Sequence, residues 1–442
     1  MMEVKCTCQF CLSSQYSVDI ASFSQKRRCG VSGILRVKND AEFLADSIES
    51  CIEALDELII VYNDCTDQSP EIIKIKAKQY CNKIKYYEYK PKIYSNNLSE
   101  EEYKFIKSQP EDSPHLLANY YNFALSKVTY EFVMKIDADQ IYLTSELKLL
   151  CDAYRCVDKV LINPIELLNF VYFYLGVLLY KKLGFMILFN KRYLFKQYRK
   201  CLLKFVSNYK IPIFLSGYNM FYHNKSWYVP LGKKNKETLN ILPPYNGVTD
   251  HSIFRLSSKT YFVPIEMKEY TQLNSHRRSL IEVLCGVRFA FPYGFIWMHL
   301  NGMRRNIYIK QEENYIQNGD RYLLFNDFVK KKFCKIDCVL DTTILSQQNR
   351  LLYSVLHDVV DYKKMEKFVE KYYMDIDNNL ISWECNLNSV WFLFLLNHNK
   401  YNFFFLDLQM LLKVVFGCVQ GRRRMSRLYT LAHIRELPFL CV

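Results

Sequence analysis

Between residues 31 and 88, short apolar runs alternate with amphipathic stretches, and this alternation limits the fold more than any other feature. The runs VSGILRV, ELIIVY and KIKYYEY have the composition of strands, and the stretches between them place apolar residues at helical spacing. Strand, helix and strand at this pace are typical of a parallel sheet with helices on both faces. We therefore predict an α/β fold with a doubly wound, mainly parallel sheet.

A further strand, YEFVMKI, is predicted at residues 130–136, and it ends in two aspartates. Its apolar residues point to both sides, as a central strand requires, and Asp137 and Asp139 follow directly. Side chains at positions i and i+2 of an extended chain point the same way, about 6.6 Å apart. Open α/β sheets bind ligands at this carboxyl edge, so we expect both carboxylates to face one ligand site.

Two carboxylates at this spacing favour a bound cation. At about 5 Å they repel each other by roughly 3 kcal/mol if the effective dielectric constant is near 20. Mg²⁺ and Mn²⁺ prefer oxygen ligands and commonly take one or two carboxylates, together with water and substrate phosphates. We therefore predict that Asp137 and Asp139 bind a divalent cation. An ion pair of these aspartates with lysine or arginine that leaves no room for the cation would count against this prediction. A second such pair, Asp375 and Asp377, has the pattern of a solvated helix end.

Three segments carry a resemblance to a known family. In order, VSGILRVKNDAEFLADSIES, DELIIVYNDCTDQSPEI and NYYNFALSKVTYEFVMKIDADQ resemble the nucleotide-sugar half of GT-A glycosyltransferases, in particular the bacterial family-2-like inverting enzymes. The resemblance covers residues 31–145. It implies a Rossmann-like GT-A fold in which Asp139 binds Mn²⁺ or Mg²⁺, and Asp137 approaches the ribose or the metal.

The same resemblance implies a nucleotide site on the loops after the first two strands. Val37 and Asn39 would border the base, and Asp64 would accept a hydrogen bond from uracil or ribose. The turn reads NDCTD, where many relatives have two adjacent aspartates, so Asp67 stays open as the alternative to Asp64.

An inverting transfer needs a carboxylate that takes the proton of the acceptor hydroxyl. Asp250 is the candidate, because the turn in ILPPYNGVTDHSIF delivers it before an apolar segment. The alternative is that Asp250 caps a helix that begins at Ser252. His251 is a candidate for completing the metal shell, and a structural role is its alternative.

Two further groups are candidates for substrate contacts. Arg277, in LNSHRRSL, would neutralise the donor diphosphate, although a solvated basic patch explains the same residues. Trp227 and Tyr228, in SWYVPLG, present aromatic faces that can stack on an acceptor sugar, and core packing is the alternative.

The formal net charge of +14 indicates a surface that faces anions, such as phosphate, anionic lipid or nucleic acid. No run of about 20 uncharged apolar residues occurs. Residues 167–190 come nearest, but Lys181 and Lys182 interrupt them and the basic, aromatic KRYLFKQYRK follows. This pattern suits a segment at a membrane interface, and a buried helix with a solvated end explains it equally well.

Sixteen scattered cysteines, and a start without the pattern of a secretory leader, predict reduced thiols in a cytoplasmic protein. Cys6, Cys8 and Cys11 lie close together but lack a second ligand pair at zinc-site spacing. We therefore expect them to belong to an unstructured tail rather than to a metal site.

These patterns predict four regions. They are an amino-terminal tail (1–30), a nucleotide-sugar-binding half (31–145), an acceptor and catalytic half (146–310) with a membrane-interface insertion (165–210), and a mostly helical region (311–442).

The predicted function is that of a metal-dependent, inverting glycosyltransferase. It would move a sugar from a nucleotide donor, expected to be UDP-linked, to a glycan or glycolipid such as bacterial lipooligosaccharide or capsule, at the inner face of the cytoplasmic membrane. The alternative is a non-catalytic basic protein that associates with membranes or nucleic acid.

Overall fold

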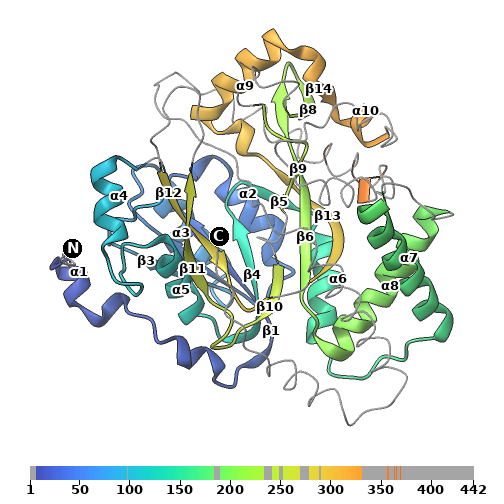
Figure 1. Ribbon diagram of the computed structural model, residues 1–442, viewed down its shortest axis with the longest axis horizontal. Helices are drawn as coiled ribbons and strands as arrows, with labels where there is room; N and C mark the ends of the chain where they lie inside the picture. The colour runs from blue at the N-terminus through green and yellow to red at the C-terminus, as the bar shows by residue number, and fades with distance from the viewer. Residues whose placement is uncertain are drawn as a thin grey trace.

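The computed structural model describes residues 6–96, 98–183, 190–232, 241–247, 252–268, 278–287 and 290–330, and residues 356, 357, 363, 365 and 369. The described chain builds a central nine-stranded sheet with the strand order β3-β2-β1-β4-β10-β6-β13-β5, and β9 pairs with β6 (Figure 1). Its strands are β1 (Arg28–Val37), β2 (Glu57–Tyr62), β3 (Ile84–Glu88), β4 (Tyr130–Asp137), β5 (Gln140–Tyr142), β6 (Ile213–Asn219), β9 (Tyr245–Asn246), β10 (Ser252–Arg255) and β13 (Phe291–His299).

The first four strands form the parallel half of this sheet. β1 pairs in parallel with β2 and with β4, and β2 pairs in parallel with β3. β10 runs antiparallel to both β4 and β6, and β13 runs parallel to β6. The predicted α/β fold with a mainly parallel sheet is therefore confirmed.

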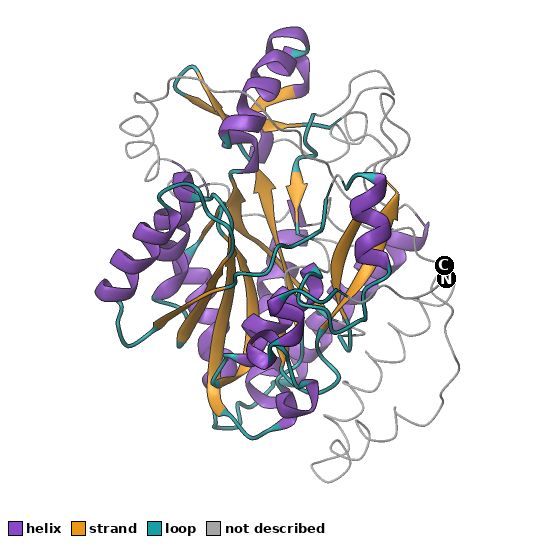
Figure 2. Cartoon of the chain, turned by 90° about the vertical axis from the view of Figure 1, so that its left-hand side faces the viewer, coloured by secondary structure: helices purple, strands orange, loops and turns teal. Residues whose placement is uncertain are grey.

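Helices cover both faces of the sheet, because successive residues of each central strand point to opposite sides. On β1, Leu35 belongs to one hydrophobic core and Ile34 to the other. The first core contains residues of α2 (Ala41–Ile52), α3 (Ser69–Gln79) and α6 (Thr144–Arg155). The second is built on α5 (Leu117–Ser126), and α4 (Glu100–Lys107) lies beside the hairpin of β11 (Phe262–Lys268) and β12 (Arg278–Leu284) (Figures 1 and 2).

The predicted amino-terminal tail is part of the folded domain from residue 6 on. It forms α1 (Gln9–Leu12), η1 (Ser14–Tyr16) and η2 (Ile20–Ser24). Tyr16 and Phe23 are buried in the second core, where the Tyr16 ring lies 4.9 Å from that of Tyr89. The prediction of a tail was wrong here because two separated aromatic residues hold the segment, and they leave no periodic pattern in the sequence.

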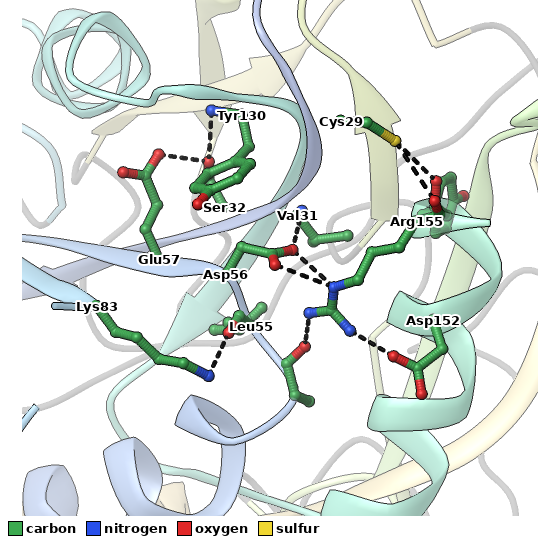
Figure 3. Close-up of polar contacts among 12 residues, drawn as sticks. Cys29, Val31, Ser32, Leu55, Asp56, Glu57, Lys83, Tyr130, Asp152 and Arg155 are labelled. Atoms are coloured by element: carbon green, nitrogen blue, oxygen red, sulfur yellow. Dashed lines mark hydrogen bonds and ion pairs between the residues drawn. The ribbon is translucent and has the colours of Figure 1, made fainter. Parts of the chain in front are cut away.

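Buried and half-buried charged side chains stabilise the edge of the sheet at which the parallel strands begin (Figure 3). Arg155 pairs with Asp56 at 2.8 Å, and Asp56 also accepts the backbone N–H of Val31 at 2.7 Å. Glu57, only 2% exposed, accepts hydrogen bonds from the hydroxyl groups of Ser32 and Thr129 at 2.7 and 2.8 Å. These contacts tie β1, β2 and β4 together at the edge far from the aspartate pair.

Two long helices, α7 (Pro164–Leu183) and α8 (Lys191–Tyr209), pack against each other beside the sheet (Figure 1). α7 buries Phe170 and Phe173, which agrees with the buried-helix alternative, while Ile165 and Leu168 are each 68% exposed. None of the described helices is both long enough and apolar enough to cross a membrane.

The remaining elements form a small layer around the end of β6. A three-stranded sheet is built from β7 (Phe221–His223), β8 (Ser226–Pro230) and β14 (Tyr322–Leu324), next to the short turns η3 (Asn301–Met303) and η4 (Gly319–Arg321) and the helices α9 (Arg305–Gln317) and α10 (Phe325–Lys330). Most of the region predicted to be helical, 311–442, lies outside the described residues.

Candidate functional site

Three strands bring polar residues to one edge of the central sheet. β4 ends at Asp137, β6 at Asn219 and β13 at His299. β4 and β6 run in the same direction because β10 is antiparallel to both, and β13 is parallel to β6. Their carboxyl ends therefore share the edge at which open α/β sheets bind ligands. Asp139 lies in the turn that follows β4.

Asp139 is buried, with 4% of its surface exposed, and both of its carboxylate oxygens face cationic or basic groups. Its Oδ2 accepts a hydrogen bond from Arg304 Nε at 3.0 Å, and its Oδ1 lies 3.4 Å from His299 Nε2. Burial disfavours the charged carboxylate, but the charges of Arg304 and His299 outweigh it and hold the pKa of Asp139 well below its usual range. Asp139 is therefore an anion at neutral pH.

Asn219 fixes the orientation of the His299 ring. Asn219 Nδ2 donates to the carbonyl of Pro243 at 2.7 Å, so its amide oxygen points the other way, 2.6 Å from His299 Nδ1. An amide oxygen only accepts, so Nδ1 carries the hydrogen. Nε2 therefore faces Asp139, to which it donates when it carries a hydrogen, and its lone pair becomes available to a metal ion when that hydrogen is absent. A histidine held through its second nitrogen in this way is typical of metal sites.

Arg304 links Asp139 to the end of β1. Its Nη2 lies 2.7 Å from Asp40 Oδ1 and 3.0 Å from Asp139 Oδ2. Asp40 also accepts the backbone N–H of Lys38 at 3.0 Å. Burial raises the pKa of Asp40 although Arg304 opposes it, and the two carboxylates raise the pKa of the Arg304 guanidinium against its own burial. One guanidinium thus bridges two carboxylates, from the segments that follow β1 and β4.

The contact with Arg304 is the kind of ion pair that would count against a metal site, and it occupies one oxygen of Asp139. The other oxygen, Oδ1, together with His299 Nε2, offers an oxygen and a nitrogen ligand 3.4 Å apart. Adjacent ligands of an octahedral Mg²⁺ or Mn²⁺ lie about 3.0 Å apart. The residues present therefore fit a divalent cation at Asp139 Oδ1 and His299 Nε2, with Asp137 nearby.

A hydrogen-bonded chain connects Asp137 to the turn before residues 248–251. Gln140 Nε2 lies 3.4 Å from Asp137 Oδ2 and 3.3 Å from Asn246 Oδ1, which also accepts the indole N–H of Trp297 at 3.1 Å. Gly247 has φ of +85°, and a Cβ there would lie 2.4 Å from the Trp297 ring. The turn at Asn246 is thus fixed against Trp297, and only glycine fits next to it.

The residues predicted to hold the nucleotide lie on two neighbouring loops. Val37 is the buried last residue of β1, and Asn39 Oδ1 accepts the backbone N–H of Thr66 at 2.7 Å, which joins the loops. Asp64 is exposed and pairs with Lys38 at 3.0 Å. Both oxygens of Asp67 accept backbone N–H groups, from Ala41 and Ser69 at 3.0 Å. Asp67 therefore stabilises the loops, and Asp64 is the acidic side chain of the turn that faces solvent.

Three predicted site residues, Asp250, His251 and Arg277, lie outside the described residues. The alternative role of Asp250 as a helix cap was wrong, because Ser252–Arg255 form the strand β10 instead of a helix. β10 belongs to the central sheet, because Ile253 pairs with Met134 of β4 and with Ile213 of β6.

The predicted acceptor residues belong to the small sheet. Trp227, on β8, is 5% exposed, and its ring lies 5.0 Å from that of Tyr222. The Tyr228 ring packs 5.1 Å from that of Tyr315. Trp227 is thus mostly covered by protein, and Tyr228 presents the larger accessible part of the pair.

Three residues of the cluster carried no role in the sequence-based predictions: Asp40, His299 and Arg304. The strand FPYGFIWMH ends in His299 just as YEFVMKID ends in Asp137, and this parallel was the available signal. Nothing in the sequence pattern pairs Arg304 with Asp40 or Asp139, since 165 positions separate Arg304 from Asp139.

One protein-family model matches part of this chain. Residues 14–211 match the family model described as Beta-1,4-N-acetylgalactosaminyltransferase (CgtA). The resemblance to glycosyltransferases is confirmed. The matched segment contains β1 to β5 and both aspartates of the pair, whereas His299 and Arg304 lie beyond it. No relative was found among curated protein sequences.

Two solved glycosyltransferase structures were also matched. Glucosyl-3-phosphoglycerate synthase from Mycobacterium tuberculosis, in complex with Mn²⁺, UDP and glucosyl-3-phosphoglycerate, is 17% identical over 28% of this chain, with a TM-score of 0.17. The match spans only 37% of the synthase. Residues 1–349 of TarS from S. aureus are 13% identical, with 78% of this chain and 91% of that chain covered and a TM-score of 0.24.

Proposed function

We propose that this protein transfers a sugar from a UDP-linked donor to a glycan or glycolipid acceptor. The family match over residues 14–211 supports a glycosyltransferase. The observation that carries the proposal is the convergence of Asp139, His299 and Arg304 at the carboxyl edge of the sheet. A fixed cation-binding and cationic cluster at this edge suits the diphosphate of a nucleotide sugar.

A divalent cation, Mn²⁺ or Mg²⁺, would be held by Asp139 Oδ1 and His299 Nε2, with Asp137 as a further ligand or ribose contact. When bound, it stabilises the negative charge of the departing diphosphate. Arg304 contributes a second positive charge beside it. His251 stays a candidate for the same shell, and Arg277 for the diphosphate.

The nucleoside would lie on the two loops joined by Asn39 and Thr66. Val37 borders the base, and Asp64 accepts from uracil or ribose once Lys38 turns away from it. Because this ion pair is exposed at both side chains, breaking it costs less than about 1 kcal/mol.

Asp250 is the proposed catalytic base. It takes the proton of the acceptor hydroxyl while that oxygen attacks the anomeric carbon, the bond from this carbon to the diphosphate breaks, and UDP leaves with inversion. Its described neighbours in the chain support the assignment. Asn246 is linked to Asp137 through Gln140, and Ile253 pairs with Met134, three residues before Asp137.

A membrane-bound acceptor, such as bacterial lipooligosaccharide or capsule, is supported by an apolar stripe at the start of α7. Ile165 and Leu168 follow helical spacing on α7, Leu161 lies in the loop just before it, and each of the three is more than two thirds exposed. Tyr172 continues the stripe at 38% exposure. We expect peripheral binding to anionic vesicles at low salt, and the replacement of Ile165 and Leu168 by serine to abolish flotation. No flotation of the unaltered protein would remove the membrane proposal.

Donor binding is tested by thermal shift with UDP, GDP and CMP, each with and without Mn²⁺. UDP with Mn²⁺ should raise the melting temperature most, and Asp139→Asn should abolish the rise. Asp158→Asn is the matched control, because Asp158 is exposed on a loop after α6. The alternative of a non-catalytic, membrane-associated or nucleic-acid-binding protein predicts no shift with any nucleotide.

A further inference from the structure

A second cluster of metal-ligating side chains shares no residue with the proposed donor site. The ligand atoms of Cys6, Cys8, Cys11 and His115 all lie within 4.8 Å of one another. The three cysteines come from the amino-terminal segment, and His115 precedes α5.

The spacing of these atoms fits a tetrahedral ion. Cys8 Sγ and Cys6 Sγ lie 3.3 and 3.7 Å from His115 Nε2. With metal–sulfur and metal–nitrogen bonds of about 2.3 and about 2.0 Å, adjacent sulfur and nitrogen ligands of tetrahedral zinc are about 3.5 Å apart. All three cysteines are free thiols. Both sulfur atoms therefore stand at ligand distance from the same nitrogen.

His115 is oriented as a metal ligand. Its Nδ1 lies 2.7 Å from the carbonyl oxygen of Lys92, which only accepts, so Nδ1 carries the hydrogen and Nε2 faces the sulfur atoms. The histidine is 5% exposed, and its ring lies 6.0 Å from that of Tyr94. A metal-ligating histidine commonly donates its other ring N–H to a backbone carbonyl in this way, which fixes its tautomer.

The cysteine segment is also tied to the folded core. The backbone N–H of Cys6 donates to Gln109 Oε1 at 2.9 Å, and Gln109 is itself mostly buried after α4. The Phe10 ring packs 5.8 Å from that of Tyr16, which lies in the second core. The ligands are thus positioned by contacts that do not involve a metal.

We propose that Cys6, Cys8, Cys11 and His115 bind one structural zinc ion. Three thiolates and one imidazole fill all four positions of a tetrahedral zinc ion. Zinc favours this ligand set in closed structural sites. The ion would fasten the amino-terminal segment to the chain between β3 and α5. The sequence pattern does not reveal His115 as the fourth ligand, because it stands 104 positions after Cys11 with no partner at zinc-finger spacing.

The first test is made on the unaltered full-length protein, purified with reduced thiols and without chelator. Elemental analysis should give about one zinc per chain, and X-ray absorption should show three sulfur ligands at about 2.3 Å and one nitrogen at about 2.0 Å. A chain with no zinc after exposure to an equimolar zinc salt overturns the proposal. Iron in place of zinc, or a disulfide among the three cysteines found by mass spectrometry, also overturns it.

Single substitutions then locate the ligands. Cys8→Ser and His115→Gln should each lower zinc affinity about tenfold or more, and the melting temperature should fall as it does when a chelator strips the unaltered protein. Cys81→Ser is the matched control, because Cys81 is exposed and outside the cluster, and it should keep full zinc content. Unchanged zinc affinity in both ligand variants would show that the metal is elsewhere.

Two measurements separate this site from the donor site. Asp139→Asn should keep its zinc while losing UDP binding with Mn²⁺. In the unaltered protein, zinc should protect Cys6, Cys8 and Cys11 from alkylation, with Cys81 reacting freely, and a chelator should expose them. Equal alkylation with and without chelator contradicts the zinc site even if a variant fails to fold.

Discussion

His299 Nε2 lies 3.4 Å from Asp139 Oδ1, and this contact joins the end of β13 to the turn after β4. The histidine is held in place by Asn219, so its free nitrogen is already directed at the carboxylate before any ligand arrives. Such preorganisation lowers the cost of assembling a cation site.

His299→Ala is expected to weaken Mn²⁺-dependent UDP binding by about tenfold to 100-fold, because it removes a nitrogen ligand next to Asp139. UDP binding without metal should change little. Isothermal titration with and without Mn²⁺ measures both, and the control is His223→Ala, which alters a histidine of β7 that contacts Tyr308 of α9. Equal losses with and without metal would assign His299 a purely structural role.

Arg304→Met is expected to lower the free energy of unfolding by about 2 kcal/mol or more, because it leaves the buried carboxylates of Asp40 and Asp139 without their counter-charge. Mn²⁺ should restore part of this loss in the variant, since the cation supplies the missing positive charge. Urea unfolding with and without Mn²⁺ measures the effect. A variant whose stability does not respond to Mn²⁺ argues against a cation at Asp139.

Asp250→Asn is expected to retain donor affinity while transfer falls by about 100-fold or more, because an amide cannot take the acceptor proton. Turnover with a UDP-sugar and a glycan acceptor, compared with UDP affinity from titration, separates the two effects. Unchanged turnover would exclude Asp250 as the base.

Glu57→Gln is expected to destabilise the fold by about 2 kcal/mol at neutral pH, because Glu57 accepts hydrogen bonds from Ser32 and Thr129 and pairs with Lys85 at 2.8 Å. Burial opposes the charge of Glu57, but these partners outweigh it and lower its pKa. A carboxylate whose pKa is lower in the folded state stabilises the protein above the pKa of the unfolded chain, about 4.3, and loses this effect as pH falls through the folded value. The difference in urea midpoint between the unaltered protein and Glu57→Gln should therefore narrow below about pH 4. A difference that stays constant with pH would contradict this account.

Much of the sheet and the position of the aspartate pair followed from local patterns. Apolar runs separated by amphipathic stretches predicted β1 to β4, and the run before Asp137 placed the pair at a strand end. The contacts that complete both sites join residues far apart in the chain, such as Arg304 with Asp40 and His115 with Cys8. Periodicity carries no information about such pairs, because it reports only which face of an element is apolar.

The reversed direction of β10 has a consequence for how this fold can vary. Because β10 runs against β4, the chain enters it from the ligand edge, and its register is set by Ile253 opposite Met134. If the proposed function holds, changes in sequence just before Ser252 should alter acceptor preference while the ladder between β10 and β4 keeps its register. The donor and acceptor preferences of such an enzyme could then change independently.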